Sequence, residues 1–387
     1  MNGEKGKRLF GSCKKAGLKM IRSVWFWLLL LLPAGLLLRV CAQNINGFAD
    51  MYCGTVYRAI SVFFNNISGI VPFSLGELLL MALPAALLVY IVFVIVRTVR
   101  ARHRRLKTVL NGLLRLIALA CAVFFLYVTN CGINYYCTDF ASRCSLHTRP
   151  VSSEELYEVC VFLAGEASAL RENLSEDENG VMLLDAGSAQ RTAAGAVNGL
   201  RSSFGFFPDG YSIPKTVILS GGMSQLKITG VYFPFTFEAN FNTEAPDCTL
   251  PFTMCHELAH VRGYMQEQDA NFIAFLACIG SGSEEFRYSG YLTALMYTSS
   301  ALRSSDAGRF ASFTEAVSDK VRADLAEHSR YWSQFDTPVA ETASRINDSY
   351  LKANSQSEGV RSYGGLTDLV IAYYYSAYKQ RTPGTAQ

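Results

Sequence analysis

The residues with the clearest chemical potential lie in one short stretch, TMCHELAHVRG, which contains His256, Glu257 and His260. Side chains four residues apart share one face of a helix, so the two imidazoles can bind the same metal ion. Glu257 directly follows the first histidine and can accept a proton from a water molecule that the ion has acidified. The pattern predicts hydrolytic chemistry at a carbonyl group, with His256 and His260 as metal ligands and Glu257 as the base.

A third metal ligand is expected shortly downstream, where the acidic candidates are Glu267 and Asp269. On one unbroken helix Glu267 would lie about 10.5 Å beyond His260, too far to share an ion. The chain must therefore turn, and Gly263 stands where a helix-ending glycine is expected. We favour Glu267 over Asp269, because Asn271 would then face the same way and could orient a liganding histidine. Nitrogen and carboxylate ligands favour zinc as the ion.

The elements that would position these residues form an α+β domain. Apolar residues at helical spacing predict two helices, and β-branched and aromatic runs then predict two or three strands. The helical segments are 154–174 and 185–205, and the strand segments are 215–221 and 226–235. After Pro251 a helical region continues with interruptions to the C-terminus. The metal-binding motif is therefore expected on a helix that follows a small sheet.

Other residues near these elements are candidates for contacts with a substrate or a transition state. The stretch 230–237 is either an edge strand that pairs with an extended substrate or an ordinary core strand. Glu238 and Asn240 follow it and could line a cleft or simply end the strand. Arg361 and Tyr363 lie in GVRSYGG, where one of them could stabilise a developing oxyanion or both could form a structural turn.

The composition separates the chain into two parts. Of its 387 residues 50% are hydrophobic and 17% are charged, and the net charge is +3. This excludes a disordered chain and, without a basic excess, predicts no nucleic-acid partner. The first third contains three uncharged stretches that approach or reach the length needed to cross a lipid bilayer. They are Ser23–Leu38, Leu78–Val96 and Leu116–Thr138.

The distribution of basic residues predicts the orientation of these spans. One cluster of lysines and arginines precedes the first span and another lies at 97–107, whereas the intervening loop has few. The positive-inside rule then places the N-terminus in the cytoplasm and the region after the third span outside it. We expect a multi-pass protein of the cell membrane with a basic cytoplasmic tail at 1–22, a membrane region at 23–138 and an extracytoplasmic domain at 139–387. The alternative for the first span is a cleaved signal peptide.

Two further features bear on the outer part of the chain. The segment 44–72 mixes aromatic, β-branched and polar residues and is expected to form an interfacial helix and loop. Cys131, Cys137 and Cys144 are close enough in sequence for one disulfide among them, and unpaired thiols are equally compatible with their spacing.

Several segments resemble a bacterial family of membrane proteins catalogued as a domain of unknown function. They are GVYFPFTFEANFN, PFTMCHELAHVRGYMQEQDANFIAFLAC, FRYSGYL and LKANSQSEGVRSYGGLTDL, and the resemblance covers most of the chain. More distantly, the histidine motif and the ExxAN run from Glu267 to Asn271 are similar to gluzincins, a class of zinc metallopeptidases. This resemblance implies a zincin-like domain in which His256, His260 and Glu267 bind Zn²⁺, Glu257 is the base and Asn271 orients a ligand. The short gap after His260 resembles instead the turn of metzincins.

Together these observations predict a membrane-anchored zinc metallopeptidase. Its substrate would be a peptide or protein at the cell envelope, cleaved outside the cytoplasm. The alternative is a non-catalytic sensor or envelope scaffold in which the same fold binds a metal or a peptide. A transporter is disfavoured, because the three spans contain few polar groups that would form a pathway.

Overall fold

The computed structural model describes residues 23–379 except for 211, 358 and 360–364. This part of the chain is mostly helical, with one small sheet, and it divides into two compact units. One unit contains Met1–Phe48 and Leu78–Ile133, and the other contains Ala49–Glu77 and Asn134–Gln387. Residues 49–77 lie within the range predicted as the membrane region, yet they cluster with the C-terminal domain.

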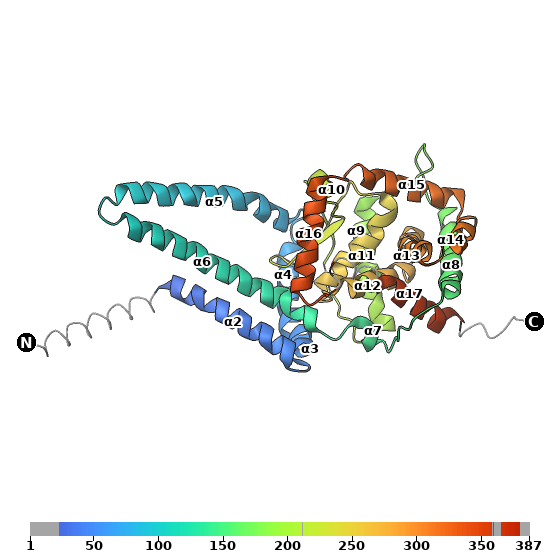
Figure 1. Ribbon diagram of the computed structural model, residues 1–387, viewed down its shortest axis with the longest axis horizontal. Helices are drawn as coiled ribbons and strands as arrows, with labels where there is room; N and C mark the ends of the chain where they lie inside the picture. Colours follow the sequence, from blue (N-terminus) through green and yellow to red (C-terminus); the bar gives the residue numbers. More distant parts are fainter. Residues whose placement is uncertain (1–22, 211, 358, 360–364, 380–387) are drawn as a thin grey trace, which may run out of the picture. The chain divides into compact units, whose positions relative to one another are not determined.

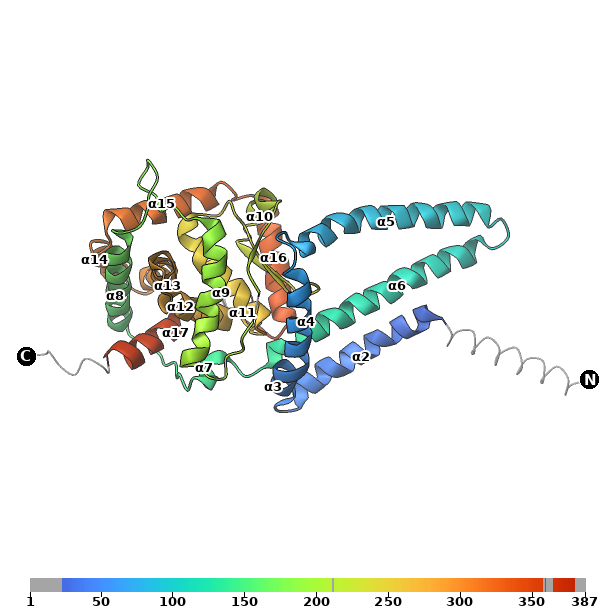
Figure 2. The same ribbon diagram turned by 180° about the vertical axis from the view of Figure 1, so that it is seen from behind.

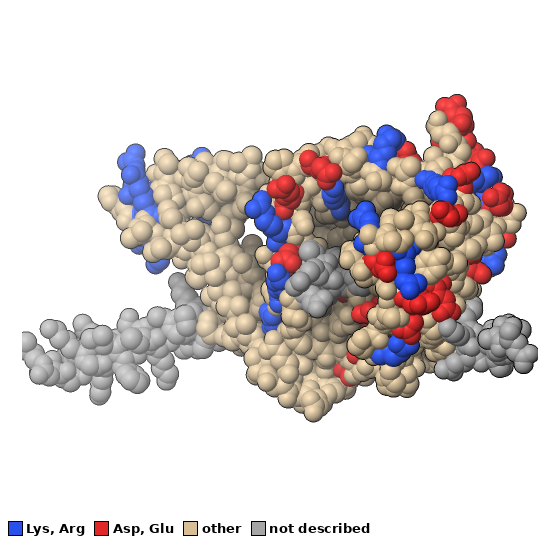
Figure 3. All heavy atoms as spheres, turned by 45° about the vertical axis from the view of Figure 1, so that its right-hand side comes forward, with Lys and Arg blue, Asp and Glu red and all other residues tan. Residues whose placement is uncertain are grey.

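Three long apolar helices form most of the first unit (Figure 1). They are α2 (Val24–Asn44), α5 (Leu75–Arg100) and α6 (Arg105–Asn130). Each is long and apolar enough to cross a membrane, and many of their large apolar side chains are exposed. α2 packs along α6, and on the face that Figure 3 shows, basic side chains gather near the turn of the α5–α6 hairpin. The three apolar spans predicted from the sequence are therefore confirmed as helices of spanning length.

The predicted boundary of the third span is wrong at its C-terminal end. The helix ends at Asn130 rather than Thr138, and Gly132–Tyr136 forms a short 3-10 helix, η2. The side chains of Ile133 and Tyr135 in this stretch are buried in the protein. An uncharged stretch has the same apolar composition whether protein or lipid surrounds it. Its composition therefore could not show where the helix ends.

The second unit surrounds a small sheet with helices (Figures 1 and 2). Its elements before the sheet are α3 (Phe48–Tyr52), the π-helical turn η1 (Cys53–Tyr57), α4 (Arg58–Ser68), α7 (Phe140–Arg143), α8 (Ser153–Arg171) and α9 (Ala186–Ser203). Those around and after it are α10 (Ser220–Gln225), η3 (Asp247–Thr249), α11 (Leu250–Val261), α12 (Glu267–Ile279), α13 (Glu284–Ser305), α14 (Ala307–Thr314), α15 (Asp319–Ser333), α16 (Pro338–Ala353), α17 (Gly365–Tyr374) and η5 (Tyr375–Lys379). The order of helices, sheet and further helices agrees with the prediction from the sequence.

The sheet has three short strands in the order β1-β3-β2. They are β1 (Lys215–Thr216), β2 (Gly230–Phe233) and β3 (Glu238–Phe241). β3 is central, pairing antiparallel with β2 and parallel with β1. β2 therefore lies at an edge of the described sheet, in agreement with the edge-strand interpretation of 230–237.

Glu238 and Asn240 do not line a cleft beside the histidine motif, and that interpretation is wrong. Strand residues alternate between faces, so these two side chains point away from the face that Ala239 shares with its β2 partner Tyr232. The Tyr232 face is the one that meets α11, since the rings of Tyr232 and His260 are in contact range with centroids 6.4 Å apart. Glu238 and Asn240 are both 2% exposed.

The Glu238 carboxylate instead holds the second unit together. It accepts hydrogen bonds from Lys215 Nζ at 2.6 Å and Thr236 Oγ1 at 2.7 Å. It also accepts from the backbone nitrogens of Leu75 and Gly76, at 3.2 and 2.8 Å, at the start of α5. A buried carboxylate with this many donors joins the sheet to the segment that leads into the second apolar helix.

We expect Glu238→Gln to destabilise the second unit by about 3 kcal/mol, because Lys215 would remain buried without its counter-charge. Thermal unfolding of the detergent-solubilised chain would measure the loss, with Glu178→Gln on an exposed loop as the matched control. The double variant Lys215→Met/Glu238→Leu should recover part of the stability. Equal unfolding midpoints for Glu238→Gln and Glu178→Gln would contradict the buried pair.

All ten described cysteines are free thiols, so the disulfide considered among Cys131, Cys137 and Cys144 is not formed. Cys137 instead lines the same cavity as Cys53. These two cysteines are separated by more than eighty residues, so no local spacing could have related them.

Candidate metal centre

The histidine motif lies on α11, a helix inside the second unit. α11 packs against α9, α12, α13 and the sheet, and all of its residues except His256 are buried. Pro251 lies in its first turn, where its missing N–H has no helical partner to lose. The polar residues of the motif are thus held in a largely apolar interior, where electrostatic interactions are stronger than in water.

A tight turn ends α11 and redirects the chain. Gly263 has a φ of +98°, which L-residues other than glycine rarely adopt. Its N–H donates to His260 O at 2.9 Å, and Tyr264 N–H donates to Ala259 O at 3.2 Å. This pair of bonds is the Schellman pattern that ends many helices. The predicted role of Gly263 is confirmed, and the next helix, α12, begins at Glu267.

The turn brings three possible ligand atoms around one point. His256 Nε2 and His260 Nε2 are 3.1 Å apart, and Glu267 Oε2 lies 3.3 Å from the first and 3.8 Å from the second. Zinc bonds of about 2.0–2.1 Å in a tetrahedron separate ligand atoms by about 3.3 Å. The triangle therefore has the dimensions of one face of a tetrahedral metal site, and these three residues could hold a divalent ion.

The turn also fixes the orientation of His260. Its Nδ1 lies 2.8 Å from the carbonyl oxygen of Tyr264, so Nδ1–H donates and Nε2 keeps a lone pair directed at the cluster. Burial lowers the pKa of His260 to about 4, and the neighbouring His256 acts in the same direction. The neutral imidazole, which is the form that binds metals, is thus the stable form at neutral pH.

Glu257 lies between the cluster and the edge strand. It is 4% exposed, and its carboxylate accepts a hydrogen bond from the backbone N–H of Tyr232. A Cβ atom at Gly230 would lie 2.5 Å from Glu257 Oε1, so only glycine leaves room for the carboxylate. Burial raises the pKa of Glu257 to about 8, in spite of the opposing effect of His256. A carboxyl group tuned close to neutrality is suited to accept and return a proton.

Asn271 and Asp269, which lie on α12 with Glu267, have different surroundings. Burial opposes the protonation of His256, but Glu267 and, with a smaller effect, Asn271 raise its pKa above the ordinary value. His256 Nδ1 and Asn271 Nδ2 have no hydrogen-bond partner among the described residues. Asp269 lies away from the cluster, since its Oδ2 accepts from the backbone nitrogen of Phe140 at 2.9 Å. The geometry groups Glu267, and not Asp269, with the two histidines.

Tyr297 on α13 is a neighbour of the cluster that the sequence did not reveal. Burial raises its pKa to about 12, and the charge of Glu267 contributes to this rise, so the phenol stays protonated at neutral pH. A polar stripe on α13, formed by Ser289, Thr293 and Tyr297 at intervals of four, was the available signal.

Of the other candidates, Arg361 and Tyr363 lie outside the described residues.

The fold and the site define a largely helical protein with three helices that could cross a membrane and a buried cluster of two histidines and one glutamate. The family model described as a protein of unknown function (DUF3810) matches residues 52–371, from α3 to α17. The chain therefore belongs to the DUF3810 family. No curated protein and no solved structure matches it.

Proposed function

We propose that this protein is a membrane-anchored, zinc-dependent peptidase with a zincin-like domain that acts outside the cytoplasm. The observation that carries the proposal is the triangle formed by His256, His260 and Glu267, with Glu257 beside it. The donor set supports zinc, because two imidazole nitrogens and one carboxylate oxygen are its common ligands at catalytic sites. When bound, zinc polarises a carbonyl group and acidifies water.

The residues of the chain have separate tasks in this proposal. Glu257 takes a proton from the attacking water and delivers it to the leaving amine. The Tyr232 N–H holds the Glu257 carboxylate in place, and the Tyr264 carbonyl keeps Nε2 of His260 directed at the ion. Tyr297, protonated at neutral pH, can donate a hydrogen bond to negative charge that develops on the substrate.

The edge strand supports an extended peptide as the substrate. β2 has no further strand on its outer side among the described residues, and Val231 is 40% exposed. A peptide that paired with this edge would gain backbone hydrogen bonds beside Glu257. The substrate would then be recognised mainly through its main chain, and pockets for individual side chains would add preference.

The proposed location follows from two basic clusters, one before the first span and one at 97–107. With the N-terminus and the segment 97–107 inside, the second unit lies outside the cytoplasm. In this orientation the candidate site acts on the envelope-facing parts of membrane proteins or on proteins outside the cytoplasm.

Burial of the cluster supports a second candidate function. The side chains of His256, His260 and Glu267 are only 13, 10 and 10% exposed. A non-catalytic sensor or scaffold would use such an enclosed metal to hold the fold and would bind a peptide at the edge of β2. In that case the metal would be present and no bond would be cleaved.

Metal analysis combined with a peptide-library assay tests the proposal. The purified full-length chain should contain about one zinc per molecule and cleave library peptides, and chelation should abolish cleavage until zinc is restored. Zinc without cleavage of any peptide or envelope protein would favour the sensor. Absence of bound zinc after supplementation would reject both functions.

Tyr297→Phe should lower the rate of cleavage by about a hundredfold and leave the zinc content unchanged, because one hydrogen-bond donor is lost. Single-turnover cleavage of a library-derived peptide would measure the rate. Tyr331→Phe, which alters a tyrosine bonded to Ser224 on a different helix, is the control. A zinc content that fell with the activity would assign Tyr297 a structural role instead.

A further inference from the structure

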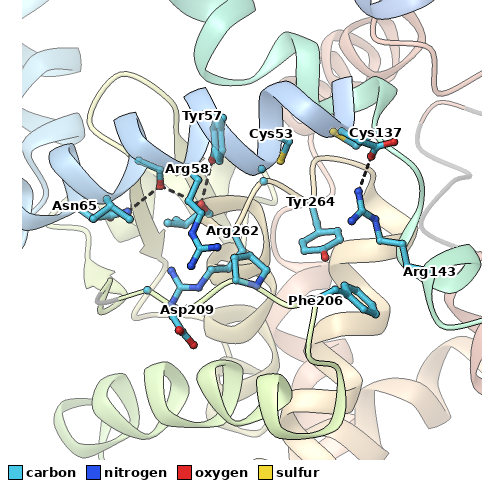
Figure 4. A pocket seen from close by; sticks show the side chains of 18 residues that line it. Cys53, Tyr57, Arg58, Asn65, Cys137, Arg143, Phe206, Asp209, Arg262 and Tyr264 are labelled. Carbon is cyan, nitrogen blue, oxygen red and sulfur yellow. Dashed lines mark hydrogen bonds and ion pairs between the residues drawn. The ribbon is translucent and has the colours of Figure 1, made fainter. Parts of the chain in front are cut away.

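A cavity of about 100 Å³ lies beside the turn that ends α11. Its walls come from η1 and α4, from the segment 206–210 and from residues 261–264 (Figure 4). None of the three candidate metal ligands lines it. The cavity is thus a separate feature, which the proposed peptidase does not use.

Three arginines and two aspartates line the cavity, but both aspartates already have cationic partners. Asp50 accepts from Arg143 at 2.5 Å and also from the backbone and the hydroxyl of Thr138. Asp209 forms an ion pair with Arg201 on α9, outside the cavity lining. Two arginines of the lining therefore remain without a carboxylate partner in the described part of the chain: Arg58 and Arg262.

Arg262 is only 6% exposed, and the acidic residue whose charge acts on it, Asp209, is already paired with Arg201. Its Nη2 donates to Asn198 Oδ1 at 3.0 Å, whereas Nε has no acceptor among the described residues. A buried cation with an unused donor has a large desolvation cost that an anion would offset.

The carbonyl groups at the end of α11 do not accept the unused donor of Arg262. Tyr57 donates its hydroxyl toward the carbonyls of His260 and Val261, at 3.2 and 3.1 Å. Ser61 also donates to Val261, at 3.3 Å. These hydroxyls satisfy the negative end of the helix, so Arg262 remains available for a ligand.

Arg58 approaches Arg262 from the opposite wall. It extends from the start of α4 into the part of the cavity that Arg262 occupies (Figure 4). Both arginines belong to the lining of this one cavity. Arg58 has no hydrogen bond or ion pair with a described residue. Asp209, whose charge acts on Arg262, is already paired with Arg201, so the repulsion between the two cations is only partly offset.

We propose that this cavity binds a phosphate-bearing anion between Arg58 and Arg262. A guanidinium group donates hydrogen bonds from a planar pair of N–H groups whose spacing matches phosphate oxygens. Two guanidinium groups from different elements could therefore bind one phosphate group from two sides. The phosphate is either a free anion or the headgroup of an anionic lipid. Both sources offer the same oxygens to the same donors.

The surroundings of Arg58 favour the lipid as the source. Large apolar side chains are exposed on α4 and on the loop after it: Phe63 60%, Ile67 46%, Ile70 79% and Phe73 42%. In sequence this segment lies between α2 and α5, two helices that could cross a membrane. An apolar surface next to a basic residue is typical of a segment that lies at a membrane interface.

Two experiments on the full-length protein test the proposal, the first in detergent and the second in nanodiscs. In the first, inorganic phosphate is added and binding is followed by calorimetry. In the second, the unfolding midpoint is compared in phosphatidylcholine nanodiscs with and without phosphatidylglycerol. The variants are Arg58→Ala and Arg262→Lys, with Arg345→Ala on an exposed face of α16 as the matched control. Arg58 is exposed, so its substitution should leave the fold intact even if Arg262→Lys does not.

Saturable phosphate binding that weakens at least tenfold in Arg58→Ala, but not in Arg345→Ala, would support a site open to the free anion. An unfolding midpoint raised by phosphatidylglycerol in the wild type, and not in Arg58→Ala, would support a lipid headgroup as the ligand. The proposal is overturned if neither probe binds, or if Arg345→Ala changes binding as much as Arg58→Ala does.

Discussion

Glu257→Gln should retain about one zinc per chain and lose cleavage of peptides by about a hundredfold to ten-thousandfold. The amide keeps the size of the side chain and its contact with the Tyr232 N–H, but it cannot accept the proton of the attacking water. None of the three proposed ligand atoms is altered, so the metal content should not change. Metal analysis and single-turnover cleavage on the same preparation measure both quantities.

A matched variant makes this experiment decisive. Glu244→Gln changes an exposed glutamate on the turn after β3 and should leave both zinc and cleavage at the level of the wild type. The inactive Glu257→Gln chain should in addition retain substrate in crosslinking from envelope extracts. If Glu257→Gln cleaves as fast as Glu244→Gln, the carboxylate is not the base. If neither the wild type nor the variant cleaves, the sensor is favoured.

Glu267→Gln should reduce zinc binding more than a hundredfold, whereas Asp269→Asn should leave it close to that of the wild type. The first change removes the proposed carboxylate ligand, 3.3 Å from His256 Nε2. The second changes a side chain that accepts from Phe140 N and is outside the cluster. Competition with a zinc-binding dye measures the affinities, and the unfolding midpoint shows whether Asp269→Asn alters stability instead.

Asn271→Ala provides an intermediate step in the same series. A residue that only orients a ligand typically contributes about tenfold to a hundredfold to metal affinity. We therefore expect zinc binding in the order wild type, Asn271→Ala, Glu267→Gln, from tightest to weakest. Loss of zinc in Asp269→Asn with full retention in Glu267→Gln would assign the third ligand to Asp269.

The local parts of the candidate site could be predicted from the sequence because helical geometry alone relates His256 to His260. The turn was predictable too, since a glycine follows the motif and Glu267 could not be reached without one. The surroundings depend on tertiary packing. Tyr297 is thirty residues away on another helix, and no spacing rule connects it to Glu267.

The errors in the sequence-based predictions have a similar cause. Glu238 and Asn240 were expected to line a cleft or to end the strand at 230–237, but they belong to the separate central strand β3. The face to which their side chains point depends on the register of that strand, and a shift of one residue reverses it. The end of the third apolar helix was missed because buried and lipid-facing residues have the same composition. Residues 49–77 cluster with the second unit through contacts that are distant in sequence, and no local sequence pattern predicts such contacts.

The Schellman turn at Gly263 also has a consequence for the order of folding. It confines all three proposed ligands to the twelve residues from His256 to Glu267, so closing the loop between them costs little chain entropy. Such a helix–turn–helix can form early, and metal capture would stabilise it before distant elements such as α13 arrive. The folding chain could then acquire its ion as a nucleus for folding, with β2 and Tyr297 completing the site afterwards.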